Sequence, residues 1–250
     1  MANNSRKESS TGIYHVMLRG INKEAIFPTD REKKRALELL KESVDEHHAE
    51  VYSYCIMSNH VHLVVKAQIT ELSEFIHFWA SAYAKYYNYI HDRFGHVFQN
   101  RFKSECIEDE RYFWTCIRYI HLNPEHAGIV KNYKTYRYSS IQEYSKCESH
   151  IICDKALKLI DKTFARLHDF EKFHNQYTPE IYMDTIEELQ EQEERIAGEL
   201  LREFMKKYNC SNSEELFERI KYRCEYKKAL EKIKGISREK AKKLARKYGI

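Results

Sequence analysis

The sequence predicts an α+β protein in which an antiparallel sheet with flanking helices is followed by an all-helical C-terminal region. Three observations support this class. Short runs of alternating or β-branched apolar residues occur in the first 107 residues, and amphipathic helical runs separate them. From about residue 146 onward, the apolar residues follow helical spacing alone. Only 7 Gly and 3 Pro occur in 250 residues, so turn signals are sparse and helix is favoured.

The first elements are a strand, a helix and a strand hairpin. We expect a disordered tail over residues 1–11 and a strand near 13–19, where "GIYHVMLR" alternates. A helix follows the loop that ends at Asp30, a good N-cap residue. The segment 49–67 then predicts two strands, with a break at Ser58 and Asn59.

The next elements are a helix, a strand and a second helix. Residues 69–94 carry one apolar stripe and predict a long helix. The stretch "HVFQNRFKSECI", residues 96–107, predicts a strand because aromatic and β-branched residues are interleaved with polar ones. Residues 108–130 predict a helix with an acidic start that is stopped or kinked at Pro124. The predicted order is therefore β-α-β-β-α-β-α.

Composition excludes several classes of protein. The chain is 42% hydrophobic and 32% charged, as expected for a soluble globular protein with a core. No run approaches the about 18 apolar residues of a membrane span. The polar start "MANNSRKESS" has no apolar signal region, so we expect a cytoplasmic protein with no membrane partner. Seven scattered cysteines without a C-x-x-C pair fit reduced thiols better than a disulfide framework or structural zinc.

Charge is distributed unevenly along the chain. Residues 219–250 contain 13 Lys and Arg against 3 Glu, whereas residues 146–218 contain 10 against 17 acidic residues. A basic end on a near-neutral body favours a polyanionic partner, most often nucleic acid. A solvated, lysine-rich pair of helices is the alternative.

We therefore divide the C-terminal part into a helical region, 146–208, and a basic helical region, 209–250. In the latter, "EYKKALEKIKGISREKAKKLARKYGI" resembles the first two helices of a helix-turn-helix. A recognition helix would come after Ile250, so the region is either a truncated helix-turn-helix or a simpler basic helical hairpin. Both versions predict contacts with duplex DNA.

Two histidines lie one residue apart in the apolar run "SNHVHLVV". In a strand, His60 and His62 project from the same face while Val61 points to the other. Two imidazoles side by side form half of a metal site. Taken alone, the pair is better explained by a solvent-facing strand edge or a hydrogen-bonded core than by a metal site.

A second pair of polar residues lies on the predicted helix in "CIRYIHLNP". Tyr119 and Asn123 are four residues apart and share one helical face. An amide oxygen suits a hard divalent cation, and a phenolic oxygen can act as a nucleophile. Asn123 precedes Pro124, which biases it away from helical geometry and leaves its direction open.

At this point the sequence resembles a known family. The segments "YHVMLRGINKEAIF", "MSNHVHLVV", "GHVFQNRFKS" and "RYIHLNPEHAGIV", in this order and spacing, resemble the HUH-type single-tyrosine transposases and, within them, the REP-associated tyrosine transposase group. The resemblance spans residues 12–145. It implies an HUH endonuclease fold with a ferredoxin-like or RRM-like core.

The resemblance also implies roles for single residues. His60 and His62 match the family's metal-binding histidines, Asn123 matches the third ligand, and Tyr119 matches the catalytic tyrosine. It implies a single-stranded DNA endonuclease and strand transferase that uses Mg²⁺ or Mn²⁺. The tyrosine attacks a phosphate of hairpin-containing DNA, which gives a 5′-phosphotyrosine and a free 3′-hydroxyl, and the enzyme acts as a monomer or homodimer.

Several alternatives stay open. Candidate DNA contacts, equally compatible with ordinary surface charge, are Arg19, Asn22, Gln99, Arg101 and Lys103. Tyr83 and Tyr87 have the spacing of two-tyrosine relatives, but Tyr83 lies on the apolar stripe and predicts core packing. The histidines expected in local hydrogen bonds or at the surface are His15, His96, His121 and His126. An idle DNA-binding protein and a metal-dependent phosphodiesterase without a covalent intermediate are the competing functions.

Overall fold

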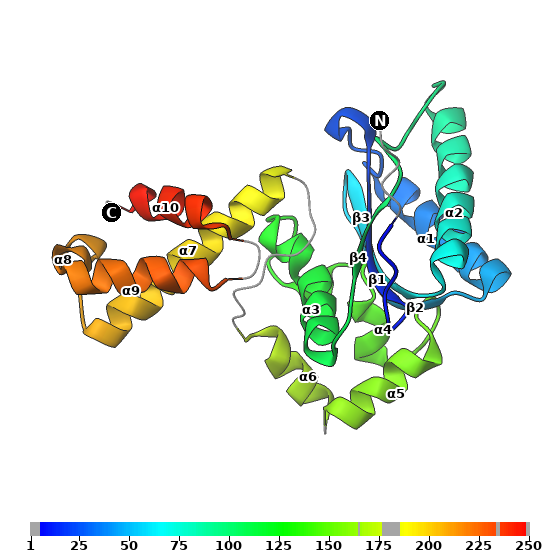
Figure 1. The fold of residues 1–250 in the computed structure, drawn as a ribbon. Coiled ribbons are helices and arrows are strands. Elements are labelled where there is room, and N and C mark those ends of the chain that lie inside the picture. Colours follow the sequence, from blue (N-terminus) through cyan, green and yellow to red (C-terminus); the bar gives the residue numbers. More distant parts are fainter. Residues whose placement is uncertain (1–5, 165, 177–185, 234–235, 249–250) are drawn as a thin grey trace. The chain divides into compact units, whose positions relative to one another are not determined.

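The computed structural model describes residues 6–164, 166–176, 186–233 and 236–248, and it contains two compact units, 1–176 and 177–250. In chain order, the N-terminal unit contains the elements β1 (Ile13–Arg19), the 3-10 helix η1 (Ile21–Lys23), α1 (Asp30–His47), β2 (Glu50–Ile56), β3 (His60–Lys66), α2 (Ile69–Ile90), β4 (Lys103–Cys106), α3 (Glu110–His126), the 3-10 helix η2 (Tyr133–Thr135), α4 (Ile141–Lys146), α5 (Asp154–Thr163) and α6 (Leu167–His174) (Figure 1). The predicted α+β class and element order are confirmed.

The four strands form one antiparallel sheet in the order β2-β3-β1-β4. The register places Met17 of β1 opposite His62 of β3, which in turn lies opposite Cys55 of β2. Because neighbours in register share a face and successive residues alternate, His60 and His62 lie on one face. Val61 is fully buried and points to the other.

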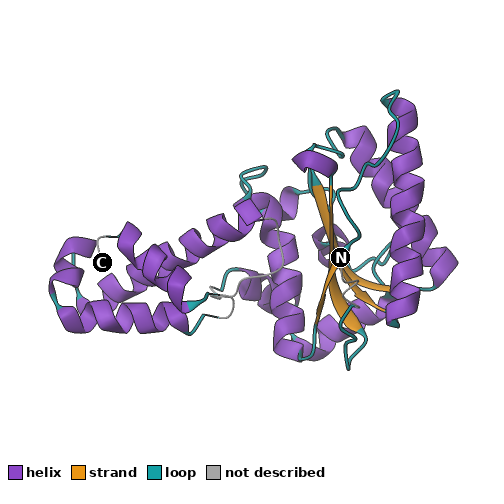
Figure 2. Ribbon diagram, turned by 45° about the horizontal axis from the view of Figure 1, so that its top comes forward, coloured by secondary structure: helices purple, strands orange, loops and turns teal. Residues whose placement is uncertain are grey.

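Helices cover both faces of this sheet (Figures 1 and 2). Helices α1 and α2 lie on one side, joined by a hydrogen bond of 2.9 Å from Trp79 Nε1 to the carbonyl of Ala36. Helix α3 lies on the other side and packs on β2 and β3. Thr29, one residue before the predicted position, is the N-cap of α1, and its hydroxyl accepts from the Arg31 amide.

The predicted strand over 96–107 is only partly correct. β4 begins at Lys103, and residues 97–99 instead attach to the end of β1 and the loop after it. The Gln99 amide donates to the Arg19 carbonyl at 2.9 Å, and the Ile21 amide donates to the Val97 carbonyl at 2.9 Å. Adjacent exposed polar residues at 99–101 interrupt the alternation between these two paired segments.

The predicted disordered tail is wrong for residues 6–11, while residues 1–5 lie outside the described ranges. The Ser9 amide donates to the Tyr14 hydroxyl, the Thr11 hydroxyl donates to the Ile107 carbonyl, and the Arg6 guanidinium lies 3.7 Å from the centroid of Phe102. These contacts with non-neighbouring residues tie the segment to the sheet, which local composition could not predict.

Helix α3 does not stop at Pro124 but continues to His126. Helical hydrogen bonding continues past the proline, where the Ala127 amide donates to the Asn123 carbonyl at 2.9 Å. Proline therefore removes only its own amide donor, and Asn123 keeps its place on the helix.

The outer edge of β2 is covered by chain from the end of this unit. Residues 138–140 pair with it through Ile56 N to Tyr138 O at 2.9 Å and Ser140 N to Tyr54 O at 3.0 Å. The Cys153 amide extends the pairing to Val51 at 2.8 Å. Covering an edge in this way removes a site of unwanted strand pairing. Residues 146–176 thus belong to the sheet-containing unit, and the boundary lies later than the predicted 145/146.

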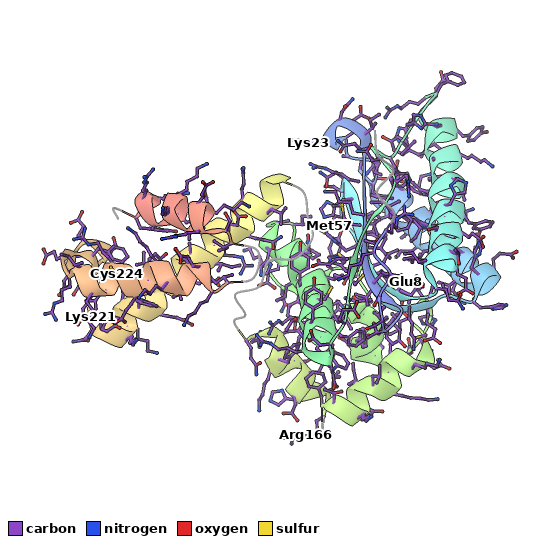
Figure 3. All side chains as sticks on the ribbon, viewed as in Figure 1. Glu8, Lys23, Met57, Arg166, Lys221 and Cys224 are labelled. Carbon is purple, nitrogen blue, oxygen red and sulfur yellow. The ribbon has the colours of Figure 1, made fainter. Side chains whose placement is uncertain are left out.

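The C-terminal unit contains α7 (Ile186–Tyr208), α8 (Ser213–Glu218), α9 (Ile220–Glu231) and α10 (Arg238–Lys247). Its apolar core includes the residues predicted to form a small core, Leu230, Ile233, Ile236, Ala241 and Leu244. Ser237 caps α10 as expected, since its hydroxyl accepts from the Lys240 amide. Lys221 and Cys224 lie on the exposed side of α9 (Figure 3).

Part of the basic charge of this unit is balanced within it. Lys240 and Lys247 of α10 form ion pairs with Glu193 and Glu194 of α7. The acidic and basic stretches seen in the sequence therefore partly offset each other, whereas the exposed side of α10 keeps Lys242, Lys243 and Arg246. Within the described ranges, no helix is long and apolar enough to cross a membrane.

One buried carboxylate predicts a measurable effect on stability. Glu143 Oε2 accepts from the amides of residues 150–152 at 2.6, 2.9 and 3.1 Å, and Oε1 accepts from the Tyr54 hydroxyl at 2.7 Å. We expect Glu143→Gln to lower the free energy of unfolding by about 1–3 kcal/mol, because charge-assisted bonds are lost. Urea unfolding followed by tryptophan fluorescence measures this. Equal stability of Glu143→Gln and the exposed control Glu148→Gln would contradict it.

Candidate active site

Four side chains predicted to form the site lie together between β3 and α3. The ring centroids of His60 and His62 are 4.8 Å apart, and the ring of Tyr119 lies 5.6 Å from that of His62. Asn123 Nδ2 donates to the Tyr119 hydroxyl oxygen at 3.0 Å. All four side chains are buried, with at most 6% of their surface exposed. The structure thus brings together residues from two segments about sixty residues apart.

Local structure explains these positions. The alternation of β3 sends Val61 into the core below the sheet and both imidazoles to the opposite face. On α3, Tyr119 and Asn123 are one turn apart, so their side chains meet. The helix begins at a strong cap, because the Asp109 carboxylate accepts from the Tyr112 amide at 2.7 Å.

Each histidine uses its Nδ1 in a hydrogen bond. His60 Nδ1 lies 2.7 Å from Asn59 Oδ1, and His62 Nδ1 lies 2.9 Å from Nε2 of His15. An amide oxygen only accepts, so the proton of neutral His60 resides on Nδ1 and the lone pair on Nε2. If His15 Nε2 accepts the hydrogen bond from His62, then the proton of neutral His62 is likewise on Nδ1 and its lone pair is on Nε2.

The donor set fits a hard or borderline divalent cation. Two imidazole Nε2 atoms and the Asn123 amide oxygen are neutral ligands suited to Mn²⁺ and, through oxygen, to Mg²⁺. The amide nitrogen of Asn123 is used by Tyr119, which leaves Oδ1 as the ligating atom. Among the described residues, no group of three His, Cys, Asp or Glu side chains is placed to hold a metal, and Asn123 is the candidate for a third ligand beside the two imidazoles.

His15 is buried beneath the pair on the same sheet face. Its ring centroid is 5.1 Å from that of His62 and 6.2 Å from that of Tyr119. Burial, together with the nearby His62, holds the pKa of His15 well below the ordinary histidine value. The imidazole is therefore neutral at pH 7. The sequence predicted only a local hydrogen-bonding role, and this partner makes it part of the site.

A second histidine network anchors the opposite side of α3. His121 Nδ1 lies 2.9 Å from His174 Nε2, and His121 Nε2 lies 2.8 Å from the Ser140 hydroxyl. His174 Nδ1 donates to the Phe170 carbonyl at 2.8 Å. This chain of hydrogen bonds links α3 to α6 and to the segment that pairs with β2, so it fixes the helix that carries Tyr119.

The candidate DNA contacts divide into two groups. Arg19, Gln99 and Lys103 lie on the sheet face of His60 and His62: Arg19 is opposite His60 in register, Lys103 is opposite Met17, and Gln99 is bonded through its backbone to Arg19. Lys103 and Gln99 are exposed.

The other two candidates lie elsewhere. Asn22 lies in η1 with a left-handed backbone (φ 51°), in the loop that also carries Lys23 (Figure 3). Arg101 lines a cavity of about 820 Å³ between α2 and residues 95–102. Burial and the charge of Arg101 lower the pKa of Arg6, which lines the same cavity.

The alternative tyrosines are core residues. Tyr83 is fully buried and donates to the Ile26 carbonyl, and Tyr87 packs beside it on α2. The remaining histidines are where they were expected, because His96 and His126 are exposed and His121 is hydrogen-bonded inside the unit.

Sequence reasoning missed Asn59 and the site role of His15. Asn59 directly precedes His60, so its position in the sequence could have suggested a hydrogen bond with that histidine. For His15, the signal was its position on a strand that must pair with the histidine strand, with alternation toward the same face. Only the register identifies His62 as its partner.

Comparison with known proteins shows which family the N-terminal unit is similar to. The sequence model of the family described as "Transposase IS200 like" matches residues 8–123. This matched segment lies within the N-terminal unit and is similar to the IS200-like transposases, and the C-terminal helical unit lies outside the match. No curated protein matches the chain.

Two solved structures are similar to this chain. One is a REP-associated tyrosine transposase bound to a REP hairpin, at 13% identity and a TM-score of 0.49, covering 58% of this chain and 86% of that one. The other is a proposed transposase from Deinococcus radiodurans, at 13% identity and a TM-score of 0.34, covering 48% of this chain and 94% of that one.

The buried histidine network predicts a loss of stability in acid. Burial lowers the pKa of His174 to about 4, whereas an unfolded histidine titrates near 6.5. Between these values the unfolded chain binds more protons, so stability is full above pH 6.5 and falls as pH drops toward 4. The shift corresponds to about 3 kcal/mol.

The measurement compares the wild type with His174→Gln, which keeps an acceptor for His121 but cannot titrate. Urea unfolding at pH 7, 5.5 and 4.5, followed by tryptophan fluorescence, reports on this unit because both tryptophans, Trp79 and Trp114, lie in it. We expect the stability advantage of the wild type to shrink as pH falls. Parallel pH profiles for the two proteins would contradict this.

Proposed function

We propose that this protein is a metal-dependent, single-tyrosine DNA endonuclease and strand transferase. It acts on single-stranded DNA, at sites that contain a hairpin. The observation that carries the proposal is the hydrogen bond between Asn123 and the Tyr119 hydroxyl, on a tyrosine whose ring lies 5.6 Å from that of His62, the neighbour of His60. A phenol can serve as the nucleophile of phosphodiester cleavage, and an amide with two imidazoles can hold the metal ion that assists it.

The proposed step is an in-line substitution at phosphorus. Tyr119 loses its phenolic proton to solvent, and its oxygen attacks the scissile phosphate of DNA. The bond between phosphorus and the 3′-oxygen breaks, and that oxygen takes up a proton. The products are a 5′-phosphotyrosine and a free 3′-hydroxyl, and attack by a 3′-hydroxyl on the phosphotyrosine reverses the step and transfers the strand.

Phenols ordinarily titrate near pH 10, so the nucleophile requires activation. The amide of Asn123 donates to the Tyr119 oxygen, and a hydrogen bond to the charged form favours the phenolate. His60, His62 and the oxygen of Asn123 would hold Mg²⁺ or Mn²⁺. When bound, such a cation polarises the scissile phosphate and offsets the charge that develops on it. The hydrogen bonds of His121 with His174 and Ser140 hold α3, the helix that carries Tyr119.

The open part of the same sheet face offers a path for the DNA strand. Arg19 and Lys103 supply positive charge, and Gln99 supplies hydrogen-bonding groups, beside the histidines. Contacts of this kind position the phosphate backbone without reading its sequence. Asn22 in η1 and Arg101 beside α2 would contact other parts of the DNA, outside this sheet face. The exposed basic side of α10 would hold flanking duplex DNA, and either a monomer or a homodimer fits this scheme.

Covalent capture tests the proposal. With a labelled single-stranded hairpin DNA and Mn²⁺, we expect a protein–DNA adduct that survives denaturation and is absent in Tyr119→Phe. The control Tyr83→Phe removes the alternative hydroxyl and keeps the adduct. DNA cleavage that persists in Tyr119→Phe would support a phosphodiesterase instead, and binding without cleavage in the wild type would support an idle DNA-binding protein.

Salt dependence tests the proposed path of the strand. We expect Lys103→Ala to weaken binding of single-stranded DNA and to reduce the slope of log affinity against log salt by about 0.7, the value for one phosphate contact. The control Lys41→Ala removes an exposed lysine of α1 that pairs with Asp45. Fluorescence anisotropy at several salt concentrations measures both. Identical slopes in Lys103→Ala and the wild type would exclude the contact.

A further inference from the structure

His15 occupies a position that core packing alone does not explain. Its side chain is fully buried on β1, in the middle of the sheet. Its Nδ1 has no hydrogen-bond partner among the described residues. Placing an imidazole there costs desolvation that a leucine would avoid. The hydrogen bond it makes is the one to Nδ1 of His62, at 2.9 Å.

The register explains how this contact arises. Met17 lies opposite His62, and His15 lies two residues earlier on the same face, so His15 and His62 are diagonal neighbours on adjacent strands. Their ring centroids are 5.1 Å apart and the rings are inclined by 32°, and Nε2 of His15 lies 2.9 Å from Nδ1 of His62.

One proton is shared along this bond, and its position decides what His62 can do. If His62 Nδ1 donates to His15, the lone pair of His62 is on Nε2, which is the state that binds a metal. If His15 donates instead, His62 carries its proton on Nε2 and cannot be a ligand. His60 has no such ambiguity, because Asn59 Oδ1 can only accept.

We propose that His15 is a positioning residue that accepts the Nδ1 proton of His62 and thereby holds His62 in its metal-binding tautomer and orientation. Asn59 performs the same task for His60. The inference rests on the proposed function, since it assigns a role toward the metal site of His60, His62 and Asn123. It adds a residue from a third segment of the chain, strand β1, to the site formed by β3 and α3.

Metal affinity tests this role without using activity. Mn²⁺ alone is titrated into the full chain by calorimetry, for the wild type, His15→Leu and His15→Gln. Loss of a partner of this type typically weakens metal binding by about 10- to 100-fold, which we expect for His15→Leu. His15→Gln supplies an amide oxygen near the position of the His15 Nε2 atom, which can accept the Nδ1 proton of His62. We expect this variant to keep most of the wild-type affinity for Mn²⁺.

The control is Cys55→Ala. Cys55 is the fully buried neighbour of His62 on the other adjacent strand, and its thiol donates to Met57 Sδ at 3.6 Å. We expect this variant to bind Mn²⁺ as the wild type does. A second readout is the ¹⁵N spectrum of the histidine rings in the metal-free chain, in which His62 should carry its proton on Nδ1 in the wild type.

The outcomes separate the two proposals. Wild-type affinity in His15→Leu, equal losses in His15→Leu and His15→Gln, or a His62 protonated on Nε2 in the wild type would each overturn the role of His15. A wild-type chain that binds no Mn²⁺ would overturn the metal requirement of the proposed function, and the inference with it. The proposal is supported if His15→Leu binds Mn²⁺ weakly while His15→Gln and Cys55→Ala bind it nearly as the wild type does.

Discussion

The pairing of β1 with β3 is the interaction on which the candidate site depends. It places Arg19 opposite His60 and Met17 opposite His62, so that His15 reaches His62 diagonally. A shift of one residue would send both imidazoles into the core beneath α1 and α2 and bring Val61 to the site face. The fully buried Val61 and Leu63 oppose such a shift, because they would lose their apolar surroundings. The core residues of β3 thus fix the geometry of its polar ones.

Helix α3 must present Tyr119 and Asn123 to this strand, and it is held from two sides. Its site face meets the histidines, and its opposite side is bound by the hydrogen bonds of His121 with His174 and Ser140. A buried network of this kind is stabilising only while every member stays neutral, because two donors would otherwise face each other. Residues 146–176, expected to be a separate helical region, thereby become part of the support for the site.

The sequence predicted those parts of the site that depend on local geometry. The alternation around Val61 and the one-turn spacing of Tyr119 and Asn123 require only a strand and a helix. Register, by contrast, is a relation between segments, and so the link from His15 to His62 was not predicted. The same reason accounts for the errors at the N-terminal tail and at residues 96–102, whose partners lie far away in the sequence. The charge asymmetry was real, but its partial balance between α7 and α10 required the structure.

The hydrogen-bond partners behind the two histidines are both neutral, and this has an electrostatic consequence. Many metal-binding histidines donate to a carboxylate, which adds negative charge next to the ligand. Here an amide oxygen and an imidazole nitrogen take that place. With an amide as the proposed third ligand, the donor set would leave the full charge of a divalent cation to act on its substrate. In a buried site this charge is poorly screened, so an anionic phosphate would be attracted strongly. Neutral hydrogen-bond partners therefore suit the proposed site, in which the phosphates of the DNA substrate would supply the balancing negative charge.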